Sequence, residues 1–250
     1  MNNSTSTKPN SQHSLVQSFL LHLAPGVLVT AAFLILKVLL DSTGFPPLLA
    51  FLLVILLVDI PFMLGVVFSE GKKLNGHFSL EGVVRYRQKV SWKTFLLVFV
   101  GAFVVVYLLV MLAAPVSTFL AESLFSGLPD WLFLEEQTQY EGYAKGILVG
   151  VFTLQLVLTG VILPWVEELY FRGYLLPRIS RYEKWAPLLG GVFFALYHVW
   201  QLYSFPTVFL LGAALGYVVW WTRDIRTSAS LHIVANLASR LVFLLAAMAM

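Results

Sequence analysis

The sequence contains no cysteine among its 250 residues, and charged residues are scarce. The absence of cysteine excludes disulfide bonds, a thiol nucleophile and thiolate metal sites. Lysine, arginine, aspartate and glutamate together make up 12% of the chain, whereas hydrophobic residues make up 59% and the mean hydropathy is +0.83. A soluble domain carries about twice that share of charge. The chain is therefore expected to be an integral membrane protein.

Short segments of alternating hydrophobicity, the pattern of membrane β-barrels, are also missing. The hydrophobic runs are continuous instead, and several approach the length of about 20 residues that a helix needs to cross a bilayer. We predict a polar, flexible tail over 1–18 and a single all-α domain over 19–250, built as a polytopic transmembrane helix bundle. Its seven spans are expected near 20–40, 46–68, 94–114, 146–176, 186–203, 206–222 and 228–250.

The distribution of basic residues predicts the orientation of this bundle. The loop 69–93 carries six basic residues and two acidic ones, and 12 of the 16 basic residues fall in segments on the same side of the predicted spans. By the positive-inside rule that side is the cytoplasm, so the N-terminus is expected inside and the C-terminus outside. No eukaryotic retention tail is recognisable and the chain is short, which favours a prokaryotic plasma membrane.

A few ionisable or strongly polar residues interrupt the predicted spans. Such residues cost at least about 2.5–3.5 kcal/mol on insertion scales and usually mark a functional site. Asp59, Lys37 and His22 lack a partner pattern and are interpreted as structural or interfacial. The remaining set consists of Glu167, Glu168, Arg172, His198, His232, Asn236 and Arg240.

The depths of these residues agree between helices. Counted from the nearest basic residue at about 1.5 Å per helical residue, Glu167 and His198 lie roughly 17 and 21 Å deep. On the same count His232 and Asn236 lie roughly 9 and 15 Å deep. Three helices thus bring polar groups to overlapping depths. This predicts a shared polar intramembrane cavity that opens toward the cytoplasmic side.

Helical spacing suggests which of these residues work together. Glu168 and Arg172 are four residues apart and can form an ion pair on one helix face, which leaves Glu167, turned by about 100°, for another role. Pro164 can bend the helix just before the glutamates. Phe194, one turn before His198, is expected to wall the cavity. The last helix carries a polar stripe of three residues, each four apart: His232, Asn236 and Arg240.

These residue types fit hydrolysis of an amide bond. A carboxylate beside an imidazole in a partly dry cavity can activate water, and a second imidazole with an amide can donate hydrogen bonds to an oxyanion. A covalent mechanism has no obvious nucleophile, because no serine lies between Trp165 and Phe171 and cysteine is absent. One glutamate and two histidines, Glu167, His198 and His232, are also a zinc ligand set. The common HExxH arrangement is missing, so the residues leave zinc open and suggest no other cofactor.

Three short motifs carry a resemblance to a known family. "EELYFR" (Glu167 to Arg172) fits EExxxR, "FALYH" (Phe194 to His198) fits FxxxH, and "HIVAN" (His232 to Asn236) fits HxxxN. In this order, over roughly 146–240, they resemble the signature of the CAAX protease and bacteriocin-processing (CPBP, or Abi) family of intramembrane proteases. That family includes the type II CAAX prenyl endopeptidases.

The resemblance implies a role for each residue of the set. Glu167 would be the general base for water, assisted by His198, with His232 and Asn236 as the catalytic residues at the oxyanion. Glu168 and Arg172 would be a supporting pair. The family is described both as metalloprotease and as metal-independent glutamate protease, so zinc stays open.

The expected function is an intramembrane endopeptidase that acts on a membrane-associated substrate of prenylated CAAX type or of bacteriocin or signal-peptide type. Its partners would be the lipid bilayer and a peptide or lipidated protein, and no nucleic acid. The alternative is a non-catalytic membrane scaffold or bacteriocin-immunity-type partner protein. A proton-coupled transporter is disfavoured, because the sequence shows no inverted repeat or matched pair of broken helices.

Overall fold

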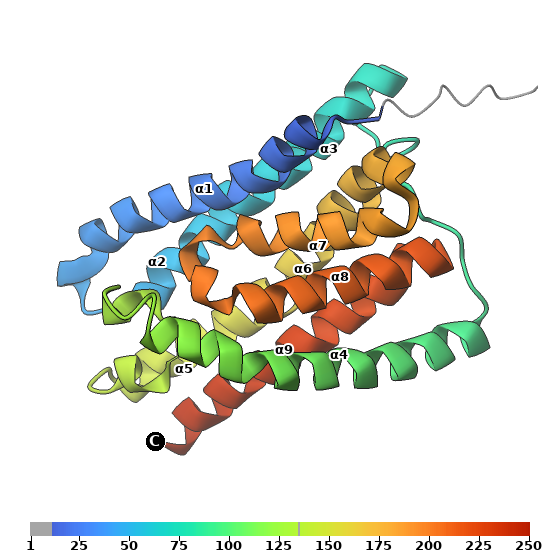
Figure 1. Ribbon diagram of the computed structural model, residues 1–250. Coiled ribbons are helices and arrows are strands. Elements are labelled where there is room, and N and C mark those ends of the chain that lie inside the picture. The colour runs from blue at the N-terminus through green and yellow to red at the C-terminus, as the bar shows by residue number, and fades with distance from the viewer. Residues whose placement is uncertain (1–11, 135) are drawn as a thin grey trace, which may run out of the picture.

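The computed structural model describes residues 12–134 and 136–250, and the elements in this part of the chain are helical. The predicted all-α fold is therefore confirmed. The α-helices are α1 (Leu15–Leu40), α2 (Pro47–Val54), α3 (Ile60–Asn75), α4 (Trp92–Glu122), α5 (Lys145–Val157), α6 (Leu163–Glu167), α7 (Ala186–Tyr197), α8 (Phe205–Thr222) and α9 (Ile225–Ala249). Figure 1 shows them as long, crossing rods.

Wide or tight helical turns join several of these helices into longer units. The π-helical turns η2 (Ile55–Asp59) and η5 (Leu158–Ile162) connect α2 to α3 and α5 to α6. The π-helical stretch η6 (Glu168–Leu175) follows α6, and the 3₁₀ stretches η7 (Leu176–Trp185) and η8 (Val199–Ser204) lie on either side of α7. Of these five, η6 contains Glu168 and Arg172, η8 directly follows His198, and η2 contains Asp59.

Six helical stretches of the described chain have the length and composition to span a membrane, compared with seven predicted. The difference lies in Lys145–Tyr197, which is 53 residues long and holds the fourth predicted span and most of the fifth. Inside it, Glu183 adopts φ 47° and ψ −124°, which no helix allows. The chain reverses there before α7 begins (Figure 1), so the two predicted spans are separate in space.

The first helix begins earlier than the sequence suggests. Residues 1–11 of the predicted tail lie outside the described residues, whereas α1 already starts at Leu15. Ser14 caps it, because its side chain accepts a hydrogen bond from the Gln17 N–H. The helix thus begins four residues before the predicted domain start at residue 19.

The basic loop between α3 and α4 is tied to the helices that carry the motifs. The backbone N–H of Arg85 donates to the carbonyl of Gly173 in η6, and the N–H of Ile225 at the start of α9 donates to Tyr86. Asp224 caps α9 by accepting from the Arg226 N–H. Burial alone would raise the pKa of Asp224, but hydrogen bonds from the side chain and backbone of Arg226 and from the Val90 N–H lower it. The ionised cap contributes stability above its unfolded pKa, which is lost as pH falls through the lowered value.

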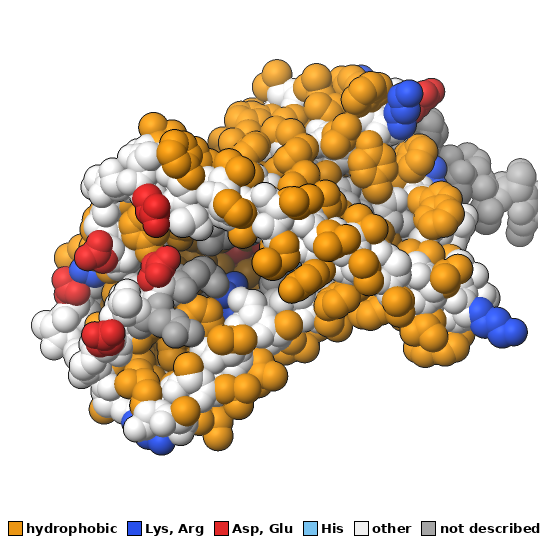
Figure 2. Space-filling view, turned by 60° about the horizontal axis from the view of Figure 1, so that its bottom comes forward, with side chains coloured by type: hydrophobic (Ala, Val, Ile, Leu, Met, Phe, Trp, Pro, Cys, Tyr) orange, Lys and Arg blue, Asp and Glu red, His pale blue; other side chains and the backbone are white. Residues whose placement is uncertain are grey.

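Charged side chains gather at the two ends of the molecule. Figure 2 shows acidic side chains clustered at one end, where Figure 1 places the α4–α5 connection, and hydrophobic side chains over the surface between the ends. The basic α3–α4 loop lies at the opposite end (Figure 1). This is the arrangement expected of a spanning bundle. Which side of the membrane each end faces stays a prediction.

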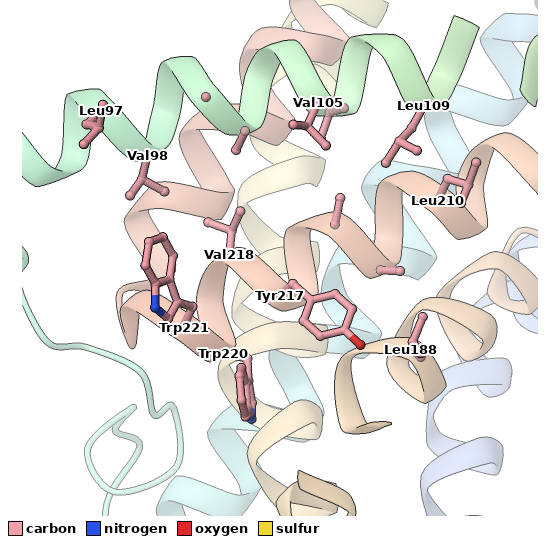
Figure 3. A pocket seen from close by; sticks show the side chains of 15 residues that line it. Leu97, Val98, Val105, Leu109, Leu188, Leu210, Tyr217, Val218, Trp220 and Trp221 are labelled. Atoms are coloured by element: carbon pink, nitrogen blue, oxygen red, sulfur yellow. The ribbon is translucent and has the colours of Figure 1, made fainter. Parts of the chain in front are cut away.

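An apolar groove of about 800 Å³ runs between α4 and α8. Figure 3 shows side chains of both helices along it, among them Leu97, Val105 and Leu109 from α4 and Tyr217 and Trp221 from α8. Many α4 side chains are exposed, with Leu97 76% and Leu112 74% accessible. A spanning helix with this pattern is expected to face lipid. The groove is lined by residues other than those of the predicted catalytic set.

Two glycines let helices approach closely around α7. A Cβ on Gly26 of α1 would lie 1.8 Å from the carbonyl oxygen of Tyr197, and a Cβ on Gly191 of α7 would lie 2.8 Å from the backbone nitrogen of Ala213 in α8. Any side chain at either position would push backbone apart. These contacts hold the end of α7, and hence His198, between α1 and α8.

Candidate active site

Both glutamates of the first motif are buried in the centre of the bundle. Glu167 ends α6 and is 2% exposed, and Glu168 begins η6 and is fully buried. Pro164 lies in the first turn of α6 and supplies no backbone N–H, and wide turns precede and follow it. The predicted irregularity at this proline is thus present, and successive side chains in the helix point to different neighbours.

Glu168 is held by three side chains. Its Oε1 atom lies 3.0 Å from Arg172 Nη1 and 3.1 Å from His232 Nδ1, and its Oε2 atom accepts a hydrogen bond of 2.6 Å from Ser228 Oγ. The predicted contact between Glu168 and Arg172 is therefore formed, and it joins the first motif to α9. Because three side chains already contact this fully buried carboxylate, Glu168 is a poor candidate for a base that must receive a proton from substrate water.

Arg172 in turn connects η6 to α7 and α8. Its Nη2 atom donates to the carbonyl of Gly212, at 3.1 Å, and its guanidinium carbon lies 4.2 Å from the centroid of the Phe194 ring. The same ring meets the His198 ring edge-on, with centroids 4.8 Å apart. Phe194 therefore walls the cavity beside the imidazole, as its position one turn before His198 predicts. It also supports the arginine, which its spacing alone could not reveal.

His232 stands between the two glutamates. While Nδ1 faces Glu168, its Nε2 atom lies 3.6 Å from Glu167 Oε2. An ionised carboxylate only accepts hydrogen bonds, so the geometry at Glu168 assigns a proton to Nδ1. The other ring nitrogen is then directed at the second carboxyl group. His232 is 3% exposed and thus shares the burial of both glutamates.

His198 lies where α7 ends, with φ −77° and ψ 54°. Its Nδ1 atom is 2.8 Å from the Phe194 carbonyl oxygen. Since a carbonyl only accepts, Nδ1 carries the proton and donates it, which in the neutral ring leaves Nε2 as an acceptor. His198 lines the same cavity as Glu167. It can therefore take a hydrogen bond from a water molecule beside that glutamate.

Asn236 compensates for the proline of the neighbouring helix. Its Nδ2 atom donates to the carbonyl of Thr159 in η5, at 3.0 Å. In a π-helical turn the Thr159 carbonyl would accept from the N–H five residues later, but that residue is Pro164, which has no N–H. The Asn236 side chain supplies the donor instead. The amide has a second N–H. Asn236 thus has a structural partner and keeps one donor for the cavity that it lines.

The four predicted catalytic residues, Glu167, His198, His232 and Asn236, line one cavity of about 250 Å³. The predicted shared cavity is thus present. Other polar side chains in its wall are Gln155, Thr159, Gln201, Ser204, Thr207 and Arg240. This site comprises residues from α2, the α4–α5 connection, α5, η5, α6, α7, η8, α8 and α9, so three motifs far apart in the sequence meet at one place.

From the glutamates the cavity extends toward the end of the bundle that holds the C-terminus. Leu134 of the α4–α5 connection lines it, as does Arg240 in the C-terminal half of α9. Lys145 at the start of α5 donates to the Met248 carbonyl, so these segments meet at that end (Figure 1). The basic loops lie at the other end. If the basic loops face the cytoplasm, as predicted, the cavity extends toward the other side of the membrane. That is difficult to combine with the predicted cytoplasmic opening of the cavity, and both stay predictions.

Two residues near the site escaped the sequence analysis. The Tyr197 hydroxyl donates a hydrogen bond of 2.6 Å to Asp59 Oδ2 in η2, and it also interacts with Glu167. Both Asp59 and Tyr197 are fully buried. Asp59, interpreted above as structural or interfacial, thus has a structural partner that no pattern in the sequence indicates. Its place inside a predicted span was the available signal, but a partner 138 residues away cannot be read from spacing.

The other two side chains of that group have the local roles that were expected. Lys37 forms an ion pair of 2.9 Å with Asp41 at the end of α1. His22 is buried, and its Nδ1 atom lies 2.7 Å from the Ser18 carbonyl in the same helix. Both contacts are made within one turn of helix, so neither residue reaches the cavity through them.

Removal of the Tyr197 hydroxyl should destabilise the protein. Tyr197→Phe leaves a buried Asp59 without its donor, and we expect a loss of about 1–3 kcal/mol in the free energy of unfolding. Tyr197→Phe combined with Asp59→Leu should recover part of that loss, because no polar group is then left unsatisfied. Thermal unfolding of the detergent-solubilised variants measures both. Equal stability of Tyr197→Phe and wild type would contradict the importance of this contact.

The candidate zinc ligands do not form a metal site in this arrangement. Glu167 and His232 lie near each other, but among the described residues no three His, Asp or Glu side chains are grouped closely enough to hold a metal ion. His232 uses Nδ1 for Glu168 and His198 uses Nδ1 for a backbone carbonyl, which leaves Nε2 of each neutral ring available, as in zinc-binding histidines. The donor types therefore suit zinc, but the three side chains would have to move closer together to share an ion.

Comparison with known proteins supports the resemblance carried by the three motifs. Residues 149–238 match the model of a protein family described as type II CAAX prenyl endopeptidase, Rce1-like. The matched segment includes all three motifs, so the predicted resemblance is confirmed. Neither the curated proteins nor the solved structures gave a match. A match to this family, together with six helices among the described residues that are able to span a membrane, indicates an integral membrane hydrolase of the protease class.

Proposed function

We propose that this chain, whose residues 149–238 match the type II CAAX prenyl endopeptidases, cleaves a peptide bond close to the C-terminus of a membrane-attached substrate. The observation that carries the proposal is the convergence of Glu167, His198, His232 and Asn236 on one buried cavity. Because hydrocarbon cannot supply water, hydrolysis inside a membrane needs a polar cavity of this kind.

Glu167 activates water in the proposed mechanism. A water molecule between Glu167 and His198 donates one proton to the carboxylate and a hydrogen bond to the imidazole Nε2, and its oxygen attacks the carbonyl carbon of the substrate. Glu167 then gives the proton to the leaving amine as the carbon–nitrogen bond breaks. The products are a carboxylic acid and an amine, so atoms and charges balance without a covalent enzyme intermediate.

His232 and Asn236 stabilise the charge that develops on the substrate oxygen. The remaining N–H of Asn236 can donate to it, and so can Nε2 of His232 when the ring is an imidazolium. Glu168, at 3.1 Å from Nδ1, offsets the charge of that imidazolium and is itself held by Arg172. Glu168 and Arg172 are thus positioning residues that act through His232.

No step of this mechanism passes through a metal ion. Since the three candidate ligands are not grouped closely enough to share a zinc ion, we expect protein treated with a strong chelator and dialysed to keep its cleavage rate within about twofold of the untreated rate. Metal analysis of the same sample provides the control. Loss of activity that returns on addition of zinc would require the cavity residues to rearrange around the ion, and would overturn the metal-free mechanism.

The substrate class is tested by cleavage of matched peptides. Purified protein in detergent is given a fluorogenic C-terminal peptide with a farnesylated cysteine and the same peptide without the lipid, beside the His198→Ala variant. We expect cleavage of the lipidated peptide by wild type alone, with product masses that identify the bond. Cleavage of the plain peptide at the same rate would argue for a signal-peptide-type substrate. Failure to cleave any peptide would favour a non-catalytic scaffold.

A further inference from the structure

Arg240 is a charged residue of the cavity that the proposed reaction does not use. It lies on α9, in a helix long and apolar enough to span a membrane, and lines the same cavity as Glu167 and Asn236. A guanidinium at this depth is costly unless it has a role. Among the described residues that line the cavity, Glu167 and Arg240 are the carboxylate and the permanent cation. Their separation gives the cavity an acidic and a basic part.

The position of Arg240 along α9 sets its distance from His232 and Asn236, the residues proposed to bind the scissile carbonyl. It follows Asn236 by four residues and His232 by eight, which corresponds to about 6 and 12 Å at 1.5 Å per residue. An extended peptide advances about 3.3–3.6 Å per residue. A peptide whose scissile carbonyl lies between His232 and Asn236 would therefore reach Arg240 within two to four residues.

We propose that Arg240 binds the free C-terminal carboxylate of the substrate, two to four residues beyond the bond that is cut. This inference rests on the proposed function of the cavity. Arginine binds carboxylates with paired, charge-assisted hydrogen bonds, whereas Glu167 at the other end repels them. The two charges thus orient the substrate tail. Its carboxylate lies away from Glu167, and its scissile peptide bond lies beside Glu167.

The surroundings of Arg240 are compatible with such a ligand. Gln155, Thr159 and Thr207 supply neutral polar groups in the cavity wall, and the volume of about 250 Å³ restricts the occupant to a short segment. Arg240 has a partner within the protein. Its guanidinium has five N–H donors, so it can hold that partner and a carboxylate together. The site is consequently specific for a chain end rather than for an internal loop.

The test compares peptides that differ only at the C-terminus. Wild type is assayed with a lipidated peptide ending in a free acid, with the same peptide ending in an amide, and with free acids whose tails are one to six residues long. We expect amidation to raise KM roughly ten- to a hundredfold with little change in kcat. We also expect the lowest KM at tails of two to four residues. These measurements need no variant, so a misfolded mutant cannot decide them.

Variants then assign the effect to Arg240. Arg240→Gln should cleave acid and amide with equal KM, and Arg240→Lys should restore part of the preference. Lys145→Gln removes a cation at the same end of the bundle outside the cavity, and should keep the wild-type preference. Equal KM values of wild type for acid and amide, or a preference that survives Arg240→Gln, would overturn the inference while the cleavage itself upheld the proposed function. Wild type that cleaves none of these peptides would overturn both.

Discussion

Replacement of Glu167 by glutamine should lower kcat by roughly 10²–10⁴-fold while the protein stays folded. Glutamine keeps the shape of the side chain and its reach toward His232, which lies 3.6 Å from the carboxyl group. It cannot accept a proton from water, so the attack loses its base. Steady-state kinetics on the lipidated peptide measure the change, and KM should move little, because the peptide is held by other groups.

A neighbour in the cavity wall provides the control for this variant. Ser204 lines the cavity but takes no part in the proposed steps, so Ser204→Ala should retain a kcat within a few-fold of wild type. Both variants should unfold at a temperature close to that of wild type. A Glu167→Gln protein with wild-type kcat would show that another group is the base.

Replacement of Arg172 by methionine should cause the largest loss of stability. It leaves the fully buried Glu168 without the cation 3.0 Å away, and it removes the donor to the Gly212 carbonyl. Breaking a buried ion pair in this way typically costs about 3–5 kcal/mol. Equilibrium unfolding in detergent or a shift in the thermal transition measures the loss. Activity should fall as well, because His232 loses its fixed neighbour.

An exposed pair in the same protein gives a matched comparison. Lys73 and Glu70 lie 2.6 Å apart at the surface of α3, with the lysine side chain 72% exposed. Lys73→Met should change stability by no more than about 1 kcal/mol, because solvent screens such pairs. The double variant Glu168→Gln with Arg172→Met should lose less than the sum of the single changes. Similar losses for Arg172→Met and Lys73→Met would contradict the buried network described above.

The predicted part of the site depends on short-range regularity. Within one helix, a spacing of four residues fixes which side chains share a face, so the contact of Glu168 with Arg172 could be predicted. The rise per residue fixes depth, so the meeting of three helices could be predicted as well. Both regularities survive in the structure because the first and third motifs lie within helical stretches and the second is helical up to Tyr197.

The part that could not be predicted depends on contacts between distant segments and on irregular backbone. Spacing says nothing about Ser228 beside Glu168, 60 residues away, or about Tyr197 beside Asp59. Hydrophobicity also cannot locate the positive φ at Glu183, where the chain turns between two apolar stretches. The same limitation applies to the direction of the cavity, which depends on how helices cross and not on the depth of single residues.

The central claim is that water activated by Glu167, and not a protein side chain, attacks the peptide bond. Rapid-quench kinetics with excess substrate, combined with the intact mass of the quenched protein, test it most directly. The account predicts product formation that starts without a burst, and an unchanged protein mass at every time point. A burst of the amine product equal to the enzyme concentration, together with a mass increase that matches the acyl part of the substrate, would contradict it.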